Sequence, residues 1–181
     1  IREALKALET EGLVQIQANR GAIVEPLVWQ EIHHRYRMRG LLEGYAAELS
    51  CAKQDKRLIA QMQENCDLVK KAIRSSKPLN MESARTVAHL NRSFHRMIWV
   101  GSGSLTLIRF LETLDLPQSF DDSFYKNESA REVVFKHHNR IMQAFVEGDA
   151  KRAGSLMEGH VQDAADLLAS QADVHISNLC C

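Results

Sequence analysis

The sequence predicts an all-α protein: an antiparallel bundle of about six helices, preceded by a short helix and a β-hairpin. Three observations support this. From Trp29 onward no segment alternates with period two, and apolar residues instead recur at helical spacing. Aromatic residues make up only 6% of the chain, and prolines number three in 181 residues. The breaks between the apolar stretches are short, which makes consecutive helices antiparallel neighbours.

The first 27 residues combine a helix with a hairpin. Residues 1–9 favour a helix, and a glycine then ends it. Apolar runs at 13–16 and 22–24 flank Ala18-Asn19-Arg20-Gly21, which is typical of a hairpin turn. This is the order of a recognition helix and its wing, so residues 1–27 are predicted to be part of a winged helix-turn-helix. Because the sequence lacks the two earlier helices of such a domain, we expect a truncated fragment.

The remaining residues, 28–181, are predicted to form one helical domain with a sizeable core. Its breaks carry residues that end and start helices: Ser75-Ser76-Lys77-Pro78, Gly101-Ser102-Gly103-Ser104, and Gly148-Asp149, in which Asp149 suits an N-cap. The six helices are expected near residues 29–53, 55–75, 79–100, 104–125, 129–147 and 149–171.

Charge and cysteine content restrict the function. Twenty-three basic and 23 acidic residues balance to a net charge of zero, so the chain lacks the basic excess of an intact nucleic-acid-binding domain. No apolar run approaches the ~18 residues that span a membrane, and no membrane partner is expected. The four cysteines show no metal-binding spacing, which favours free thiols in a reducing cytoplasm.

Three of the eight histidines lie in the apolar stripe of their predicted helix: His95, His138 and His160. His138 and His160 are equidistant from the Gly148-Asp149 turn, so they are expected to face each other across a helical hairpin. Asn91 precedes His95 by one helical turn, and the two side chains point the same way. The other five are expected at surface or ambiguous positions: His33, His34, His89, His137 and His175.

Two interpretations of these histidines stay open. In the first, each is a separately hydrogen-bonded core histidine. In the second, the helix of His95 packs against the hairpin, and three imidazoles with the Asn91 amide form a divalent metal site. Such ligands suit zinc, nickel or manganese, with positions left for water or a ligand.

Several segments resemble one family of bacterial transcription regulators. IREALKALETEGLV followed by RGAIV is similar to the DNA-binding domain of the GntR family. RGLLEGYAAELSCAK, LNRSFHRMIWVGSGS and HNRIMQAFVEGDAKRAGSLMEGHV are similar to the FCD ligand-binding domain of its FadR-type branch. The resemblance covers nearly the whole chain. It implies a cytoplasmic homodimer whose helical domain binds an effector and whose full-length form binds a DNA operator.

The resemblance also implies a metal site. The family motif is D-x-x-x-H, followed by a histidine before the last hairpin turn and another in the last helix. Matched to this sequence, the ligands are Asn91, His95, His138 and His160. Asn91 stands where the family more commonly has Asp. An amide brings no negative charge, so a weaker affinity for the metal is expected.

Three arginines take roles from the same resemblance. Arg39 matches an arginine that faces the ligand cavity in many relatives, where a guanidinium can hold the carboxylate of a small organic acid. The alternative is a surface arginine that lies along the bundle. The position of Arg2 contacts DNA in relatives, and Arg20 lies at the tip of the wing.

The sequence therefore predicts a bacterial transcription regulator that responds to a small carboxylate effector, and no enzymatic activity. Two alternatives stay open. A metal-dependent enzyme on a helical bundle requires further catalytic motifs; of the paired Glu-x-x-His motifs of di-iron bundles, Glu31-Ile32-His33-His34 supplies one and nothing supplies the second. A dimerisation module without any ligand is the other alternative.

Overall fold

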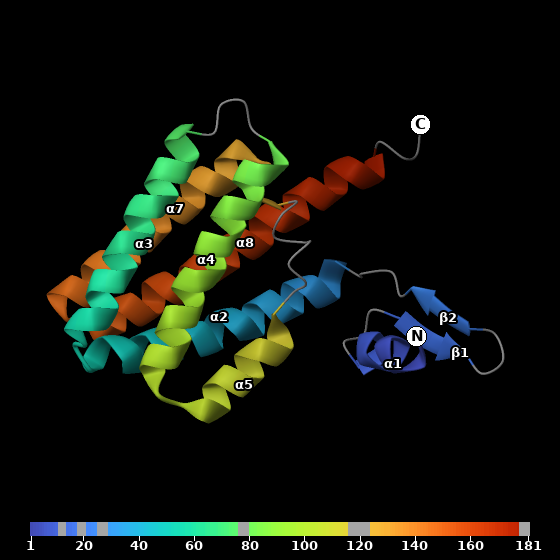
Figure 1. Ribbon diagram of the computed structural model, residues 1–181, viewed down its shortest axis with the longest axis horizontal. Coiled ribbons are helices and arrows are strands. Elements are labelled where there is room, and N and C mark those ends of the chain that lie inside the picture. Colours follow the sequence, from blue (N-terminus) through green and yellow to red (C-terminus); the bar gives the residue numbers. More distant parts are fainter. Residues whose placement is uncertain (11–13, 18–20, 25–28, 76–79, 116–123, 178–181) are drawn as a thin grey trace.

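The computed structural model describes residues 1–10, 14–17, 21–24, 29–75, 80–115 and 124–177. Its architecture confirms the predicted helical bundle with a small hairpin before it (Figure 1). The elements of the bundle are α2 (Trp29–Ala52), α3 (Lys56–Ser75), α4 (Met81–Ser102), α5 (Leu105–Leu114), α7 (Glu128–Glu147) and α8 (Ala150–Ser177).

The N-terminal segment forms the predicted helix and hairpin. Helix α1 (Arg2–Thr10) precedes β1 (Val14–Gln17) and β2 (Gly21–Val24). The two strands are antiparallel, with Val14 opposite Val24 and Gln17 opposite Gly21. Gly21 has a φ of +91°, a left-handed conformation that glycine adopts at no steric cost. The backbone N–H of Ile16 donates to Glu9 Oε1 at 2.9 Å, which ties β1 to α1.

Local signals define most helix ends of the bundle. Asn80 caps α4 through a reciprocal capping box with Ser83, and Gly103 ends α4 at a φ of 72°. Gly148 ends α7 in the same way, at a φ of 73°. Asp149 accepts a hydrogen bond from the Arg152 backbone N–H at 3.0 Å, so it serves the α8 N-terminus as predicted.

The predicted helix over residues 104–125 is wrong in its length. Helix α5 ends at Leu114, and Asp115 has an extended backbone with φ −67° and ψ 145°. A proline at position 117 accounts for this end, because a helix normally stops one to three residues before a proline. The last helix, α8, is longer than predicted and extends to Ser177.

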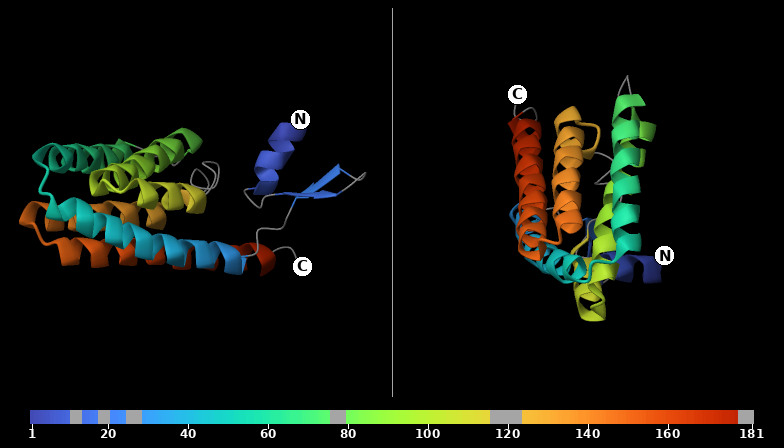
Figure 2. Two further views of the ribbon diagram at one scale, coloured as in Figure 1. Left: turned by 90° about the horizontal axis from the view of Figure 1, so that it is seen from below. Right: turned by 90° about the vertical axis from the view of Figure 1, so that its left-hand side faces the viewer.

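Helices α2 and α8 lie side by side and antiparallel along much of their length (Figures 1 and 2). Glycines permit this close approach. A Cβ added at Gly44 would lie 3.0 Å from the backbone oxygen of Gly154. Helix α4 packs against α2, α3, α5 and α7, so its buried face meets most of the bundle. This packing brings side chains from α2, α4, α7 and α8 into one interior region.

None of the described helices combines the length and the hydropathy needed to cross a bilayer.

Candidate metal and carboxylate site

The three stripe histidines converge in the interior of the bundle. His95 on α4, His138 on α7 and His160 on α8 are all buried. Nε2 of His95 lies 3.2 Å from Nε2 of His160. The ring centroids of His138 and His160 are 4.9 Å apart, as expected for residues that face each other across the α7–α8 hairpin. One nitrogen from each ring lies within 4.8 Å of the other two.

The protonation pattern of the cluster favours ligation. The Nδ1–H of His95 donates to Glu43 Oε2, so in the neutral ring the lone pair belongs to Nε2, the atom that faces His160. Burial lowers the pKa of His138 and of His160 well below the ordinary value, and neighbouring imidazoles add to this effect. Both rings are therefore neutral near pH 7, which is the form that binds metal ions.

Several buried atoms of the cluster have no hydrogen-bond partner within the described chain: both ring nitrogens of His138, Nδ1 of His160 and Oδ1 of Asn91. Buried polar atoms are normally satisfied, so this group requires an explanation. Two nitrogens bound to one tetrahedral zinc ion at ~2.0–2.1 Å lie about 3.3 Å apart. The His95–His160 nitrogen separation of 3.2 Å matches this spacing. The residues therefore fit a dication in donor type, and the His95–His160 pair fits it in spacing.

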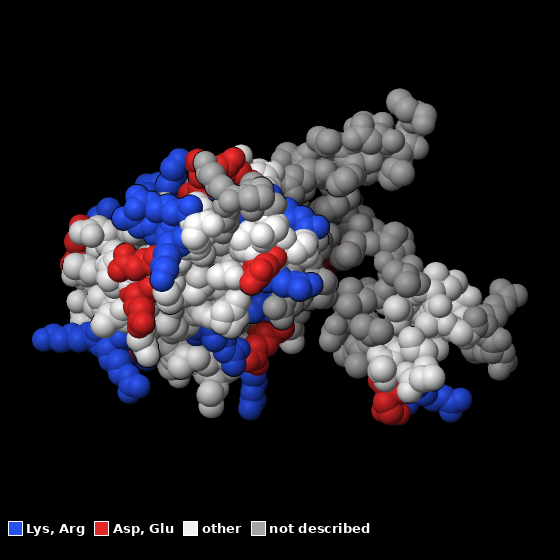
Figure 3. Space-filling model, turned by 45° about the horizontal axis from the view of Figure 1, so that its top comes forward, with Lys and Arg blue, Asp and Glu red and all other residues white. Residues whose placement is uncertain are grey.

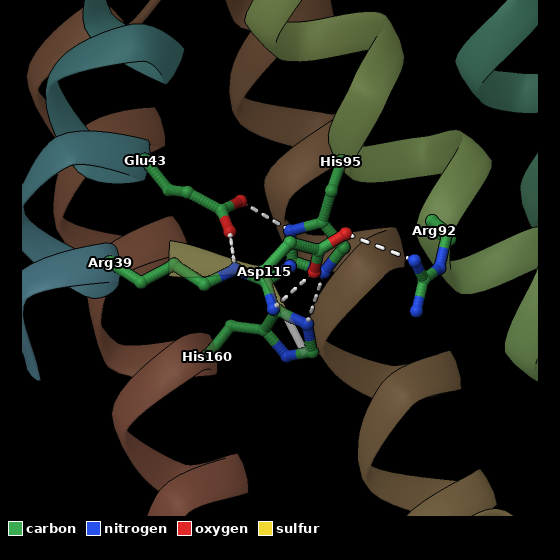
Figure 4. A network of polar contacts seen from close by, with 6 residues as sticks. All are labelled: Arg39, Glu43, Arg92, His95, Asp115 and His160. Carbon is green, nitrogen blue, oxygen red and sulfur yellow. Dashed lines mark hydrogen bonds and ion pairs between the residues drawn. The ribbon is translucent and has the colours of Figure 1, made fainter. Parts of the chain in front are cut away.

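Arg39 lies beside the cluster and not on the surface, which excludes the alternative interpretation of this residue. Its Nε donates to Glu43 Oε1 at 2.6 Å, and its Nη1 lies 3.2 Å from Asp115 Oδ1. The rings of Tyr36 and Trp99 flank the guanidinium, with centroids 5.8 and 5.6 Å from its Cζ. Figure 4 shows Arg39 reaching between Glu43 and Asp115, with His160 close by.

The buried carboxylate of Glu43 keeps its charge. Burial by itself raises the pKa of Glu43, but attraction by His95 and Arg39 outweighs burial and lowers this pKa to about 2. For Arg39 burial has the opposite direction and lowers the pKa. Attraction by Glu43 and Asp115 outweighs burial and raises the pKa of Arg39 above its ordinary value. The Arg39–Glu43 pair is thus ionised inside the bundle. Because both oxygens of Glu43 are engaged, this carboxylate holds its neighbours in place.

Three residues at the site were not predicted from the sequence: Glu43, Asp115 and Arg92. A signal for Glu43 existed, because it lies one helical turn after Arg39 on the same face of α2. The predicted helix over residues 104–125 includes Asp115 and gives its side chain no particular direction. The structure shows it at the end of α5, with Oδ2 accepting from Arg92 Nη1 at 3.0 Å. Nothing in the local sequence joins Arg92 on α4 to Arg39 on α2.

Residues of this network line two cavities. The inner cavity has a volume of about 30 Å³, and its lining includes Arg39, Asn91, His95 and His160. The outer cavity is open, has a volume of about 860 Å³, and lies among α3, α4 and α5. Its lining includes Arg92, Trp99 and Asp115. The ion pair between Arg39 and Asp115 therefore joins a residue of the inner wall to one of the outer wall.

The remaining predicted residues have separate locations, and the structure does not describe all of them. Arg2 is exposed on α1. Arg20 lies outside the described residues, as do Cys180 and Cys181. Cys51 and Cys66 are buried, free thiols. His137, expected at a surface or ambiguous position, is half-buried near Asp163, with its ring centroid 5.6 Å from that of His160.

A helical bundle with a buried polar cluster at its centre defines the class of this protein: an all-α domain with an internal site. The FCD domain model matches residues 34–163, and the chain belongs to the FCD domain family. The resemblance to the FCD-containing branch of the GntR regulators is confirmed.

Two relatives bear regulator names. The chain is 26% identical over 144 residues to the uncharacterized HTH-type transcriptional regulator YdhC of Bacillus subtilis, across 79% of this chain and 62% of that protein. It therefore spans less than two thirds of the length of that relative. It is 34% identical over 77 residues to the uncharacterized HTH-type transcriptional regulator Rv0043c of Mycobacterium tuberculosis, across 42% of this chain and 30% of that protein.

Solved structures show the same fold. E. coli McbR/YncC superimposes with a TM-score of 0.76 at 19% identity, across 94% of this chain and 84% of that one. A GntR family transcriptional regulator from Pseudomonas syringae superimposes with a TM-score of 0.60 at 18% identity, across 98% of this chain and 71% of that one. At these identities the likeness concerns the fold.

Proposed function

We propose that this chain is the effector-binding part of a DNA-binding transcription regulator, and that its helical domain binds a small organic acid at a divalent metal site. The observation that supports this most is the convergence of three buried histidines beside a buried arginine. His95, His138, His160 and Asn91 would hold the ion, which polarises and orients a bound carboxylate. Arg39 adds a fixed positive charge beside it.

Two observations support the proposed DNA binding: the N-terminal helix and hairpin, and the names of the relatives. Residues 1–27 would belong to the DNA-binding domain and residues 28–181 to the helical domain. Arg2 and Arg20 would contact DNA in the full-length protein, which would act in the cytoplasm. Figure 3 shows acidic and basic side chains interspersed over one face of the bundle, so this face offers no uniformly basic surface to DNA.

We further propose a homodimer held by the helical domain, since a regulator that reads two half-sites needs a defined distance between two DNA-binding units. Effector binding would change the spacing of these units and so the affinity for the operator. Sedimentation tests this arm: a dimer is expected, and a 20.5 kDa monomer at tens of micromolar would contradict it. Catalysis is not part of the proposal, because Glu43, which lies beside the cluster, is held by Arg39 and His95.

The metal site is tested by elemental analysis. Chelator-treated protein is loaded with zinc, nickel or manganese and freed of excess ion. About one ion per chain is expected, with loss of the ion in the double variant His95→Ala, His160→Ala. His89→Ala is the matched control, because His89 is an exposed histidine on the same helix as His95. An empty wild-type protein, or an ion that survives the double variant, would show that the cluster does not bind metal.

The effector class is tested separately. The thermal midpoint of metal-loaded protein is measured with a set of mono-, di- and tricarboxylic acids and with their amides. A rise with at least one acid, absent with its amide and reduced by Arg39→Met, is expected. If none of the acids changes the thermal midpoint, the proposed carboxylate effector is contradicted, whereas the proposed metal site is not affected.

A further inference from the structure

Asp115 already provides a carboxylate to the arginine that is proposed to anchor the effector. Its Oδ1 lies 3.2 Å from Arg39 Nη1, and its Oδ2 accepts from Arg92 Nη1 at 3.0 Å. The two oxygens of one carboxylate thus bridge two arginines from different helices, α2 and α4. A free carboxylic acid would make the same pair of charge-assisted contacts. Figure 4 shows Asp115 between these two arginines.

Among the described residues, the ion pairs of this network join two arginines, Arg39 and Arg92, to two carboxylates, Glu43 and Asp115. Glu43 is fully buried and also receives the Nδ1–H of His95, so it is fixed. The side chain of Asp115 is 21% exposed and that of Arg92 is 33% exposed. Asp115 is therefore the more accessible of the two carboxylates, and a carboxylate solute that replaces it keeps a negative charge beside both arginines.

The inner cavity is also too small to admit an organic acid while Asp115 is in place. About 30 Å³ accommodates a water molecule or two, whereas small-molecule sites enclose about 300–1,000 Å³. An organic acid therefore does not fit between Arg39 and the histidines as the chain now lies. The large outer cavity borders Asp115, and the Asp115–Arg39 ion pair joins a residue of its wall to a residue of the inner wall. Separation of this pair would remove a contact between the two walls.

We propose that Asp115 is an internal substitute for the effector's carboxylate: it occupies Arg39 and Arg92 in the ligand-free protein, and a carboxylate effector displaces it. Asp115 directly follows the last residue of α5, Leu114. Its displacement removes the two ion pairs that hold the end of α5 to α2 and α4. Effector binding is thereby coupled to the position of α5. This inference rests on the proposed function, but its test needs neither metal nor DNA.

The probe is acetate, which has the same chemical groups as the aspartate side chain beyond Cα. Trp99 reports on the site, because its ring lies 5.6 Å from Arg39 Cζ. Trp29 is replaced by Phe so that Trp99 is the remaining tryptophan. Trp99 emission is titrated with sodium acetate in the presence of chelator, at constant ionic strength, in the Trp29→Phe parent and in the same protein with Asp115→Ala.

At least a tenfold lower dissociation constant for acetate is expected in Asp115→Ala than in the parent, because an attached carboxylate competes at a local concentration of millimolar or more. Acetamide should not bind, and adding Arg39→Met to Asp115→Ala should abolish the response. Glu112→Ala is the matched control, since it removes an exposed ion pair with Arg96 from the same helix, and it should bind acetate like the parent.

Equal dissociation constants in the parent and in Asp115→Ala, or no acetate binding to Asp115→Ala, would overturn the inference. If Asp115→Ala does not fold, Asp115→Asn replaces it, because it keeps the shape and removes the charge. A dissociation constant for acetate in Asp115→Asn equal to that of the parent would likewise overturn the inference. Because chelator is present throughout, a failed metal analysis leaves this test unaffected, and a failed acetate titration leaves the metal site unaffected.

The coupling to α5 has its own measurement. Amide hydrogen exchange of residues 111–114, the last turn of α5, should accelerate at least threefold in Asp115→Ala relative to the parent. Exchange in the middle of α3 should be unchanged. Unaltered exchange at the end of α5 would show that Asp115 does not hold this helix.

Discussion

Nε2 of His95 lies 3.2 Å from Nε2 of His160, although 65 positions separate the two residues in the chain. The contact joins α4 to α8. On the other side of the His95 ring, the Nδ1–H donates a hydrogen bond to Glu43 of α2. The other oxygen of Glu43 accepts a hydrogen bond from Arg39. The orientation of one imidazole thus depends on an ion pair from a third helix.

Glu43→Gln should weaken zinc binding by about 10- to 100-fold, because the carboxylate that orients His95 and makes its ring more basic is lost. Zinc affinity is measured by competition with a chelating dye. Glu48→Gln is the matched control, because Glu48 lies on the same helix and accepts a hydrogen bond from Lys151 at 2.8 Å, away from the cluster. Unchanged zinc affinity in Glu43→Gln would show that Glu43 does not support the metal ligands.

Asn91→Asp should strengthen divalent metal binding, on the order of tenfold, because a carboxylate adds a negative charge where an amide now stands. Asn91 Oδ1 is buried and has no hydrogen-bond partner among the described residues, so an ion meets no competing contact there. The same dye competition measures the effect. Gln63→Glu, which adds a charge at an exposed position of α3, should leave the affinity unchanged. Equal affinities for Asn91→Asp and wild type would place Asn91 outside the ligand set.

Gly154→Ala should destabilise the fold by roughly 1–3 kcal/mol, the usual cost of overpacking. Its new Cβ would lie 2.5 Å from Glu48 Cγ and 3.0 Å from the Gly44 backbone oxygen, where α8 meets α2. Gly159→Ala on the same helix is the control, since nothing lies within 4 Å of its added Cβ. That variant should gain up to about 1 kcal/mol from helix propensity. Urea unfolding measures the free energy of unfolding of both variants. An unchanged free energy of unfolding in Gly154→Ala would contradict the close approach of α2 and α8.

The Cys66 thiol should resist alkylation in the native state up to pH 9. Burial, with a smaller contribution from Asp67, raises the pKa of Cys66 from 9.0 to about 12. Mass spectrometry after iodoacetamide treatment of the Cys180→Ser, Cys181→Ser variant measures this. Labelling of Cys66 should appear only when urea unfolds the chain, and native labelling at pH 8 would contradict its burial.

The same thiol affects stability at high pH. Above pH 9 the unfolded thiol loses its proton while the folded one keeps it, so the folded state binds more protons. Stability should therefore fall as pH rises above 9, with a slope of up to about 1.4 kcal/mol per pH unit from this group. Cys66→Ala removes this contribution. The difference in unfolding free energy between wild type and Cys66→Ala should thus change between pH 8 and 10, and a constant difference would contradict it.

The hairpin, the helical character of the bundle with most of its helix ends, and the facing of His138 and His160 could be predicted from the amino-acid sequence. Each of these depends on neighbours within a few turns: apolar periodicity, Gly103 and Gly148 as helix ends, Asp149 at the start of α8, and the symmetry of a helical hairpin about its turn. Such signals are local, so they are present in the chain before it folds. The end of α5 lay within reach of the same reasoning, because the proline at position 117 marks it.

Which residues surround the histidines depends on how the helices pack, and the sequence pattern does not specify this. Glu43 reaches His95 because α2 packs against α4, and α2 in turn lies close to α8 because Gly44 and Gly154 have no side chains. Asp115 meets Arg39 and Arg92 because α5 stops at Leu114 and its next residue is extended. These contacts join residues dozens of positions apart. They depend on how helices cross, and helical periodicity specifies which face is buried but not which partner covers it.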